Sequence, residues 1–165
     1  MIDQTGATLL VNNSWSGDQV IQKGVLRAKK LHNNDGVNPD IIIVYMGMND
    51  YTWGVEEQRF AYGYGRMIQN AQAAYPEADI FVCTLLTTTA MNVDRAPETV
   101  SMYNRVIKEK AAELGCHVVD LFENSGITAE NFGDYMGDKV LHPNDEGMML
   151  IANCVLQTLN EYYGQ

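Results

Sequence analysis

Short apolar runs rich in β-branched residues alternate along this chain with longer stretches of helical periodicity. We predict strands from four such runs, at Thr8–Asn12, Ile41–Met46, Ile80–Leu86 and His117–Phe122. The second run is apolar at almost every position, which is typical of a strand buried on both faces of a parallel sheet. Parallel strands need crossover connections, so this pattern predicts an α/β domain.

Helical periodicity fills the intervals between these runs. The clearest helix is predicted from Glu56 to Tyr75, where Pro76 ends it. Further helices are predicted from an Asp18 N-cap to about Leu31, from Ala96-Pro97-Glu98 to Leu114, and from Asn144 to Tyr163. No linker or repeat interrupts the alternation, so residues 1–165 are predicted to form a single domain with helices on both faces of the sheet.

Composition excludes several classes of function. The 165-residue chain has a formal net charge of -10 and a pI near 4.6, whereas nucleic-acid binding requires clustered Lys and Arg. The one cluster of basic residues has the spacing of a solvated helix face. It comprises Lys23, Arg27, Lys29 and Lys30. No apolar run reaches the roughly 18 residues of a membrane span. The three cysteines are scattered, which predicts neither a disulfide framework nor a zinc site.

Polar groups follow the strand predicted at Ile41–Met46, where Gly47, Asn49 and Asp50 come within a few residues of its end. In parallel sheets, ligands bind beyond the carboxyl ends of the strands. The sequence therefore places an unhindered backbone and two polar side chains where chemistry is expected. An ordinary strand-ending turn would use the same residue types, and this interpretation stays open.

A second polar cluster precedes the last predicted helix. Pro143 biases His142 toward an extended backbone, so His142 is predicted to lie on a loop. Asp138 stands four residues upstream, and a carboxylate beside a histidine can fix its tautomer and stabilise the imidazolium. The alternative is a surface turn in which Asn144 or Asp145 caps the helix, and the two interpretations are compatible.

Together these segments resemble the SGNH (GDSL) hydrolase superfamily of esterases and acylhydrolases. Its second, third and fifth sequence blocks are matched in order by Leu9–Gly17, by Gly47–Asp50, and by Asp138 with His142-Pro143, which have one extra residue between them. The resemblance implies a three-layer flavodoxin-like fold with a mainly parallel sheet and no metal or organic cofactor. It further implies His142 as the general base, Asp138 as its orienting carboxylate, and an oxyanion hole formed by the Gly17 N–H and the Asn49 amide.

The first block of that family, a strand ending in Gly-Asp-Ser with the nucleophilic serine, does not occur in this sequence. We expect the domain to be N-terminally incomplete, either as a truncated piece of a longer enzyme or as a natural remnant. In the family the missing strand lies in the centre of the sheet, in the order 2-1-3-4-5. We expect the open edge beside Ile41–Met46 to be filled by Leu9–Asn12, by Met1–Ala7, or by another copy of the chain.

Two serines and two histidines are further candidates for a catalytic group. Ser14 and Ser16 lie just past a predicted strand and could replace the nucleophile, or they could form the turn before the next helix. His32 ends a basic helix and His117 begins a strand. Both positions lie away from the carboxyl ends of the strands, so neither histidine is predicted to be catalytic.

Aromatic residues flank the two loops that the resemblance assigns to the oxyanion hole. Tyr51, Trp53 and Trp15 could line an acyl or sugar pocket, or they could serve only in packing. Asp50 could orient Asn49 or cap the turn, and the resemblance implies a structural role for it.

The function implied is hydrolysis of a small-molecule carboxylic ester, with an acylated carbohydrate as one candidate. One alternative is a catalytically inactive SGNH-like module that binds a ligand or carbohydrate through the same cleft. A second alternative, a flavodoxin-type nucleotide-binding domain, needs a phosphate loop at a helix N-terminus, where Asp18 places a carboxylate instead. Predicted partners are therefore a small ester and, at the open edge, a second copy of the chain, without nucleic acid or a membrane span.

Overall fold

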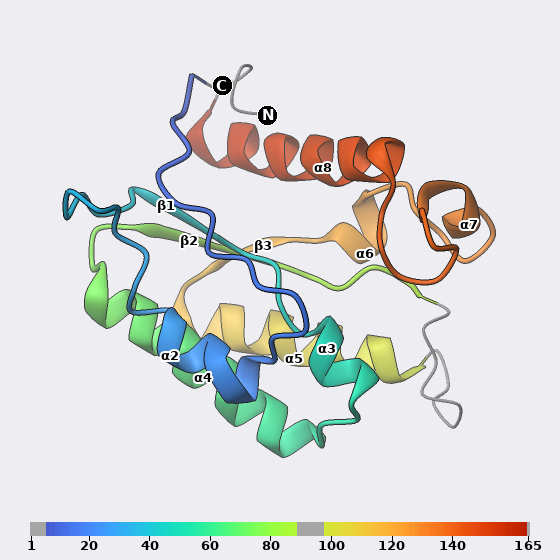
Figure 1. The fold of residues 1–165 in the computed structure, drawn as a ribbon, viewed down its shortest axis with the longest axis horizontal. Helices are drawn as coiled ribbons and strands as arrows, with labels where there is room; N and C mark the ends of the chain where they lie inside the picture. Colours follow the sequence, from blue (N-terminus) through green and yellow to red (C-terminus); the bar gives the residue numbers. More distant parts are fainter. Residues whose placement is uncertain (1–5, 89–97, 165) are drawn as a thin grey trace.

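The computed structural model describes residues 6–88 and 98–164, and a three-stranded parallel sheet lies at its centre (Figure 1). The strands are β1 (Ile41–Val44), β2 (Asp79–Cys83) and β3 (His117–Val119), hydrogen-bonded in the order β1-β2-β3. Ile42 pairs with Ile80, and Val82 with Val118. Three of the predicted strands are thus confirmed as neighbours in one parallel sheet, although each ends two or three residues earlier than predicted.

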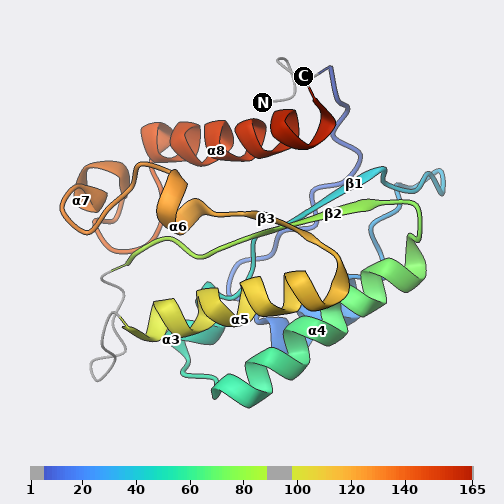
Figure 2. The same ribbon diagram turned by 180° about the vertical axis from the view of Figure 1, so that it is seen from behind.

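Helices cover both faces of this sheet (Figures 1 and 2). On one face lie α4 (Glu57–Ala74), α5 (Glu98–Leu114), a π-helical turn η1 (Val20–Gly24) and α2 (Val25–Arg27). On the other lies α8 (Asp145–Tyr163), with α6 (Leu121–Asn124) and α7 (Phe132–Tyr135) beside it, and α3 (Met48–Thr52) follows β1. Successive strand residues point to opposite faces of the sheet and belong to two hydrophobic cores. Ile42 and Val82 pack with α4 and α5, and Phe81 packs with α8. The predicted three-layer α/β fold is confirmed.

The long helices begin and end within a residue or two of the predicted positions. α4 ends at Ala74, and its C-cap Tyr75 stands directly before Pro76. The Asn144 side chain accepts a hydrogen bond from Gly147 N at 2.9 Å and caps α8. The predicted start of α5 at Ala96-Pro97 lies outside the described residues.

Two predictions for the N-terminal part are wrong. No residue of Thr8–Asn12 belongs to a strand, and the helix predicted from Asp18 to Leu31 is limited to Val20–Arg27, with a π-helical first turn. A strand needs a neighbour for its backbone N–H and C=O groups, and no described strand pairs with Thr8–Asn12. Asp18 is not the N-cap either, because Gln19 occupies that position and the Asp18 carboxylate pairs with Arg27.

The edge of β1 that faces away from β2 has no strand partner in the part of the chain that the structure describes. The segment from residue 6 to 17 passes β1 on this side (Figures 1 and 2). On β1 and just after it, Ile43 is 39% exposed and Tyr45 is 41% exposed. The expected pairing of Leu9–Asn12 with Ile41–Met46 is therefore wrong. Filling of this edge by Met1–Ala7 concerns residues mostly outside the described range, and filling by a second copy stays a prediction.

Candidate active site

The carboxyl end of β1 is shaped by a glycine that no other residue can replace without strain. Gly47 has φ 127° and stands at the N-cap of α3. A Cβ at this position would lie 3.1 Å from Cζ of the buried Phe60 ring. Both the positive φ and the close packing require glycine. This turn places Asn49 and Asp50 directly beyond the end of the strand.

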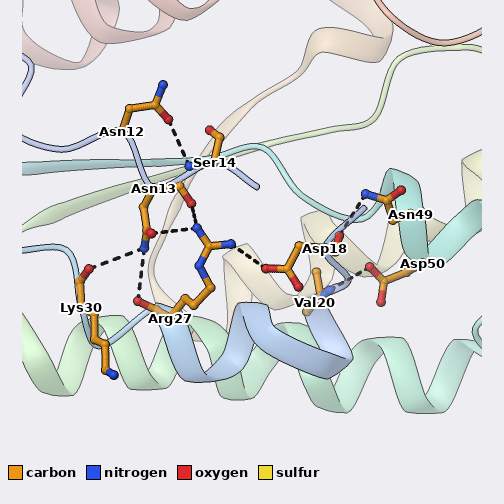
Figure 3. Close-up of polar contacts among 9 residues, drawn as sticks. All are labelled: Asn12, Asn13, Ser14, Asp18, Val20, Arg27, Lys30, Asn49 and Asp50. Atoms are coloured by element: carbon orange, nitrogen blue, oxygen red, sulfur yellow. Dashed lines mark hydrogen bonds and ion pairs between the residues drawn. The ribbon is translucent and has the colours of Figure 1, made fainter. Parts of the chain in front are cut away.

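Asn49 and Asp50 hold the loop that precedes η1 (Figure 3). The Asp50 carboxylate accepts hydrogen bonds from Val20 N at 2.9 Å and from Ile21 N at 3.4 Å, and the residue is fully buried. Burial raises the pKa of the Asp50 carboxyl, and these backbone donors partly oppose that effect. Asp50 therefore has a structural role, in agreement with the interpretation implied by the resemblance.

The two residues predicted for the oxyanion hole are linked through Asp18, which follows Gly17 in the chain and is hydrogen-bonded to Asn49. Asn49 donates a hydrogen bond through Nδ2 to the carbonyl oxygen of Asp18 at 3.0 Å, which fixes the orientation of the amide. The second N–H of that Nδ2 and the N–H of Gly17 make no hydrogen bond within the described part of the chain. Each of the two residues thus has one N–H without a partner in that part of the chain, and stabilisation of an oxyanion needs such donors.

An ion pair that the sequence did not reveal fixes the loop before η1. The Arg27 guanidinium bonds to Asp18 Oδ2 at 2.7 Å and to Asn13 Oδ1 at 2.7 Å (Figure 3). Only 4% of the Asp18 side chain is exposed, and its other carboxylate oxygen has no partner among the described residues. The Trp15 ring lies 5.3 Å from the Arg27 guanidinium carbon. Arg27 therefore neutralises a buried carboxylate next to Gly17.

The second polar cluster, before α8, brings Asp138 and His142 into contact. His142 Nδ1 lies 2.6 Å from Asp138 Oδ2. The other carboxylate oxygen accepts hydrogen bonds from three consecutive backbone N–H groups, those of residues 140–142, at 2.7–3.0 Å. Lys139 adopts a left-handed conformation with φ 63°. The tight turn around this carboxylate accommodates the extra residue between Asp138 and His142.

The loop that carries His142 lies at the same edge of the sheet as Asn49. The hydroxyl of Thr88, five residues beyond the end of β2, donates a hydrogen bond to the Val140 carbonyl at 2.7 Å. Figure 1 shows α3 and the loop before α8 at the same end of the parallel strands. Ligands of such sheets bind at this end. The residues predicted for the base and for the oxyanion hole are therefore at one edge.

The ionisation of Asp138 determines which nitrogen of His142 is free. The pKa of the Asp138 carboxyl lies well below its ordinary value of 3.8, mainly because of the Leu141 N–H, then the His142 ring and the Val140 N–H. An ionised carboxylate only accepts hydrogen bonds, so His142 Nδ1 must carry a proton. In the neutral imidazole, Nε2 is then an acceptor and is available to take a proton.

This low pKa gives a measurable prediction. Because the folded-state pKa lies below the unfolded value, ionised Asp138 stabilises the fold above the unfolded pKa, and this contribution is lost as the pH falls through the folded pKa. An NMR titration of the Asp138 carboxyl carbon is expected to give a midpoint below 3.8, and His142→Ala should raise that midpoint. A midpoint at or above 3.8 would contradict the hydrogen-bonded arrangement.

Other candidate residues lie in less suitable positions. Ser14 and Ser16 are exposed, and neither hydroxyl donates a hydrogen bond to His142. The His117 ring packs against Tyr162 in a tilted arrangement with a centroid distance of 3.9 Å, at the amino end of β3. His32 is exposed; its ring bonds to the neighbouring Asn33 carbonyl through Nδ1, and its backbone N–H donates to the Tyr75 hydroxyl.

A pocket of about 600 Å³ adjoins Gly17, one of the two residues predicted for the oxyanion hole. It is lined by Gly17, Gln19, Ile21, Gln22, Trp53, Gly54, Val55, Glu56 and Arg59. Of the three aromatic residues near these loops, only Trp53 lines it, because Tyr51 is buried in the core and Trp15 stacks on Arg27. Within residues 6–88 and 98–164, no cluster of three or more His, Cys, Asp or Glu side chains could hold a metal ion. No helix in these ranges is long and apolar enough to cross a membrane.

The three-layer α/β fold with its parallel sheet is typical of the SGNH class of hydrolases. The sequence matches the model of the GDSL-like lipase/acylhydrolase family over residues 2–150. The chain therefore belongs to this family.

No protein of curated function matches the chain in sequence. Among solved structures, it resembles the psychrotrophic esterase EstA from Pseudoalteromonas sp. with a TM-score of 0.74 and 18% identity, over 99% of this chain and 84% of that one. It also resembles a carbohydrate esterase of family 3 from Talaromyces cellulolyticus (TM-score 0.70, 21% identity, 89% and 69% covered). A third similar structure is LAE5, an α/β hydrolase from the metagenome of Lake Arreo (TM-score 0.70, 19% identity, 90% and 71% covered). These likenesses establish a shared fold.

Proposed function

We propose that this chain supplies the general base, its orienting carboxylate and the oxyanion hole for ester hydrolysis by a serine mechanism. The observation that carries the proposal is the 2.6 Å contact between His142 Nδ1 and Asp138 Oδ2 at the sheet edge that also presents Asn49. Family membership supports an acylhydrolase as the general class of activity.

In this mechanism a serine hydroxyl attacks the ester carbonyl while His142 Nε2 takes its proton. The Asp138 carboxylate holds the ring and stabilises the imidazolium that forms. The carbonyl oxygen becomes an oxyanion, which accepts hydrogen bonds from Gly17 N–H and from the second N–H of Asn49 Nδ2. His142 then returns the proton to the departing alcohol. Water next attacks the acylated serine while His142 takes the water proton, and His142 gives this proton to the serine oxygen as the carboxylic acid leaves.

The proposed mechanism also needs a nucleophilic serine. The Gly-Asp-Ser motif that carries it in the family does not occur in this sequence, so another segment must supply it. The unpaired edge of β1 supports a place for it, since a strand added there would end at the same edge as Asn49. The proposed domain is therefore an SGNH hydrolase domain that is completed by one more strand, whichever polypeptide provides it.

The test joins a strand-forming segment that ends in Gly-Asp-Ser to Met1. The segment is taken from the upstream reading frame if that frame encodes one, and otherwise from another esterase of the family. The extended chain is expected to hydrolyse p-nitrophenyl acetate, and the 165-residue chain is expected to show no burst of product. A folded extended chain without turnover would contradict the proposal.

A catalytically inactive ligand-binding module is the second candidate, and the pocket beside Gly17 is the observation that favours it. Such a module would bind through the same loops without hydrolysis. The structural neighbours include a carbohydrate esterase and an acetyl esterase. The first neighbour supports a carbohydrate as the alcohol part and the second supports an acetyl group as the acyl part, so an acetylated carbohydrate is the substrate to test first for either function.

A further inference from the structure

The pocket beside Gly17 has several polar side chains in its lining. Four of its side chains are polar or charged, namely Gln19, Gln22, Glu56 and Arg59. The neighbouring Trp53 is 75% exposed and offers an indole face to solvent at the rim. Arg59 and Glu56 take part in no ion pair with any residue that the structure describes. These groups are available to a ligand.

The pocket is connected to the oxyanion loops through hydrogen bonds. Gln22 donates to the side-chain oxygen of Gln19, and Gln19 Nε2 lies 3.5 Å from the Asn49 carbonyl oxygen. Gly17 belongs both to the pocket lining and to the proposed oxyanion hole. An ester whose carbonyl oxygen is bound at the oxyanion hole would therefore extend either its acyl part or its alcohol part into this pocket.

An acyl chain or an anion does not suit this lining. Burying the Glu56 carboxylate and the Arg59 guanidinium under a hydrocarbon chain would remove their water without replacing its hydrogen bonds, which is costly. An anion would meet the Glu56 carboxylate in a chain whose net charge is -10. The two opposite charges instead favour an uncharged ligand that both donates and accepts hydrogen bonds.

We propose that this pocket binds the sugar ring of an O-acylated carbohydrate, with Trp53 stacking on the ring and Arg59 and Gln22 bonding its hydroxyls. This inference rests on the proposed ester hydrolysis, because it assigns the pocket to the alcohol side of the ester. Hydroxyl groups match amide, carboxylate and guanidinium partners, and the C–H face of a sugar packs on an aromatic ring. A volume of about 600 Å³ is larger than an acetyl group needs and accommodates a sugar unit.

The test is an NMR titration of the 165-residue chain, which needs no nucleophile. Methyl glucoside and methyl xyloside are the probes, hexanoate represents the acyl chain, and the amides of Gly17 and Gly54 report on the pocket. At least one glycoside is expected to shift both amides in a saturable manner, and hexanoate is expected to shift neither. Arg59→Ala should weaken glycoside binding by about tenfold or more. The matched control, Arg66→Ala, changes an exposed arginine two turns further along α4 and should leave binding unchanged.

The outcomes separate this inference from the proposed function. Shifts caused by hexanoate alone, no shifts with either glycoside, or equal effects of Arg59→Ala and Arg66→Ala would overturn the sugar assignment. Glycoside binding without ester turnover after a nucleophilic serine is added would support the sugar site and contradict the hydrolase mechanism. Turnover of simple esters without glycoside binding would contradict the sugar site alone.

Discussion

Replacing His142 by alanine is expected to lower ester turnover by about 10⁴-fold or more once a nucleophilic serine has been supplied. The ring is the base that Asp138 holds at 2.6 Å, and without it no group on the loop before α8 accepts the serine proton. The loss should appear in kcat, with little change in KM, because the ring acts on the transition state. Initial rates with p-nitrophenyl acetate measure both parameters.

The control for this variant is His32→Ala, which removes another exposed imidazole that lies outside the proposed site. It should leave turnover unchanged. Asp138→Asn provides a second check, since an amide can stabilise the wrong tautomer of His142, and a loss of about 10⁴-fold is expected from such an exchange. An active His142→Ala enzyme would show that the match to the fifth sequence block had been misassigned.

The second large effect is expected from Arg27→Ala. This change leaves the Asp18 carboxylate, whose side chain is 4% exposed, without its cation. Removing one partner of a buried ion pair typically costs about 3–5 kcal/mol. Because 19% of the Arg27 side chain is exposed, we expect the lower end of that range, about 3 kcal/mol, in the free energy of unfolding. Urea denaturation followed by circular dichroism measures it.

A double variant distinguishes the lost charge pair from lost packing. Arg27→Met with Asp18→Ala removes both charges and should recover most of the stability, because the uncompensated carboxylate is gone. Arg66→Ala, which changes an exposed arginine that bonds to Gln69 on the helix surface, should change stability by less than about 0.5 kcal/mol. Equal stabilities of the Arg27→Ala and Arg66→Ala proteins would show that the ion pair below Gly17 contributes little.

The local sequence pattern correctly predicted those strands that pair with another strand of this chain. β1 was recognisable because Ile41–Val44 is apolar on both faces, and in the structure it pairs with β2. Thr8–Asn12 has a similar local pattern, but strand formation depends on a partner with free backbone groups, and no described strand pairs with it. Local pattern cannot reveal this difference, since it comes from the tertiary structure.

The site was predictable to the extent that its residues lie in compact sequence blocks. Asn49 follows a strand, and His142 precedes a proline four residues after Asp138, so their neighbourhood could be read from spacing and resemblance. Arg27 was interpreted as part of a solvated basic face, because helical spacing does not show that Asp18 lies beneath it. The bond from Thr88 to Val140 joins residues 52 positions apart and leaves no local signal.

The most direct test of the account is covalent labelling of the 165-residue chain with a serine-directed phosphonate, mapped by mass spectrometry. The account predicts no stoichiometric label on Ser14 or Ser16, because both are exposed and neither donates a hydrogen bond to His142. In the chain extended by Gly-Asp-Ser, a single label is expected on the added serine and should depend on His142. Stoichiometric labelling of Ser14 or Ser16 would contradict the account and identify that residue as the nucleophile.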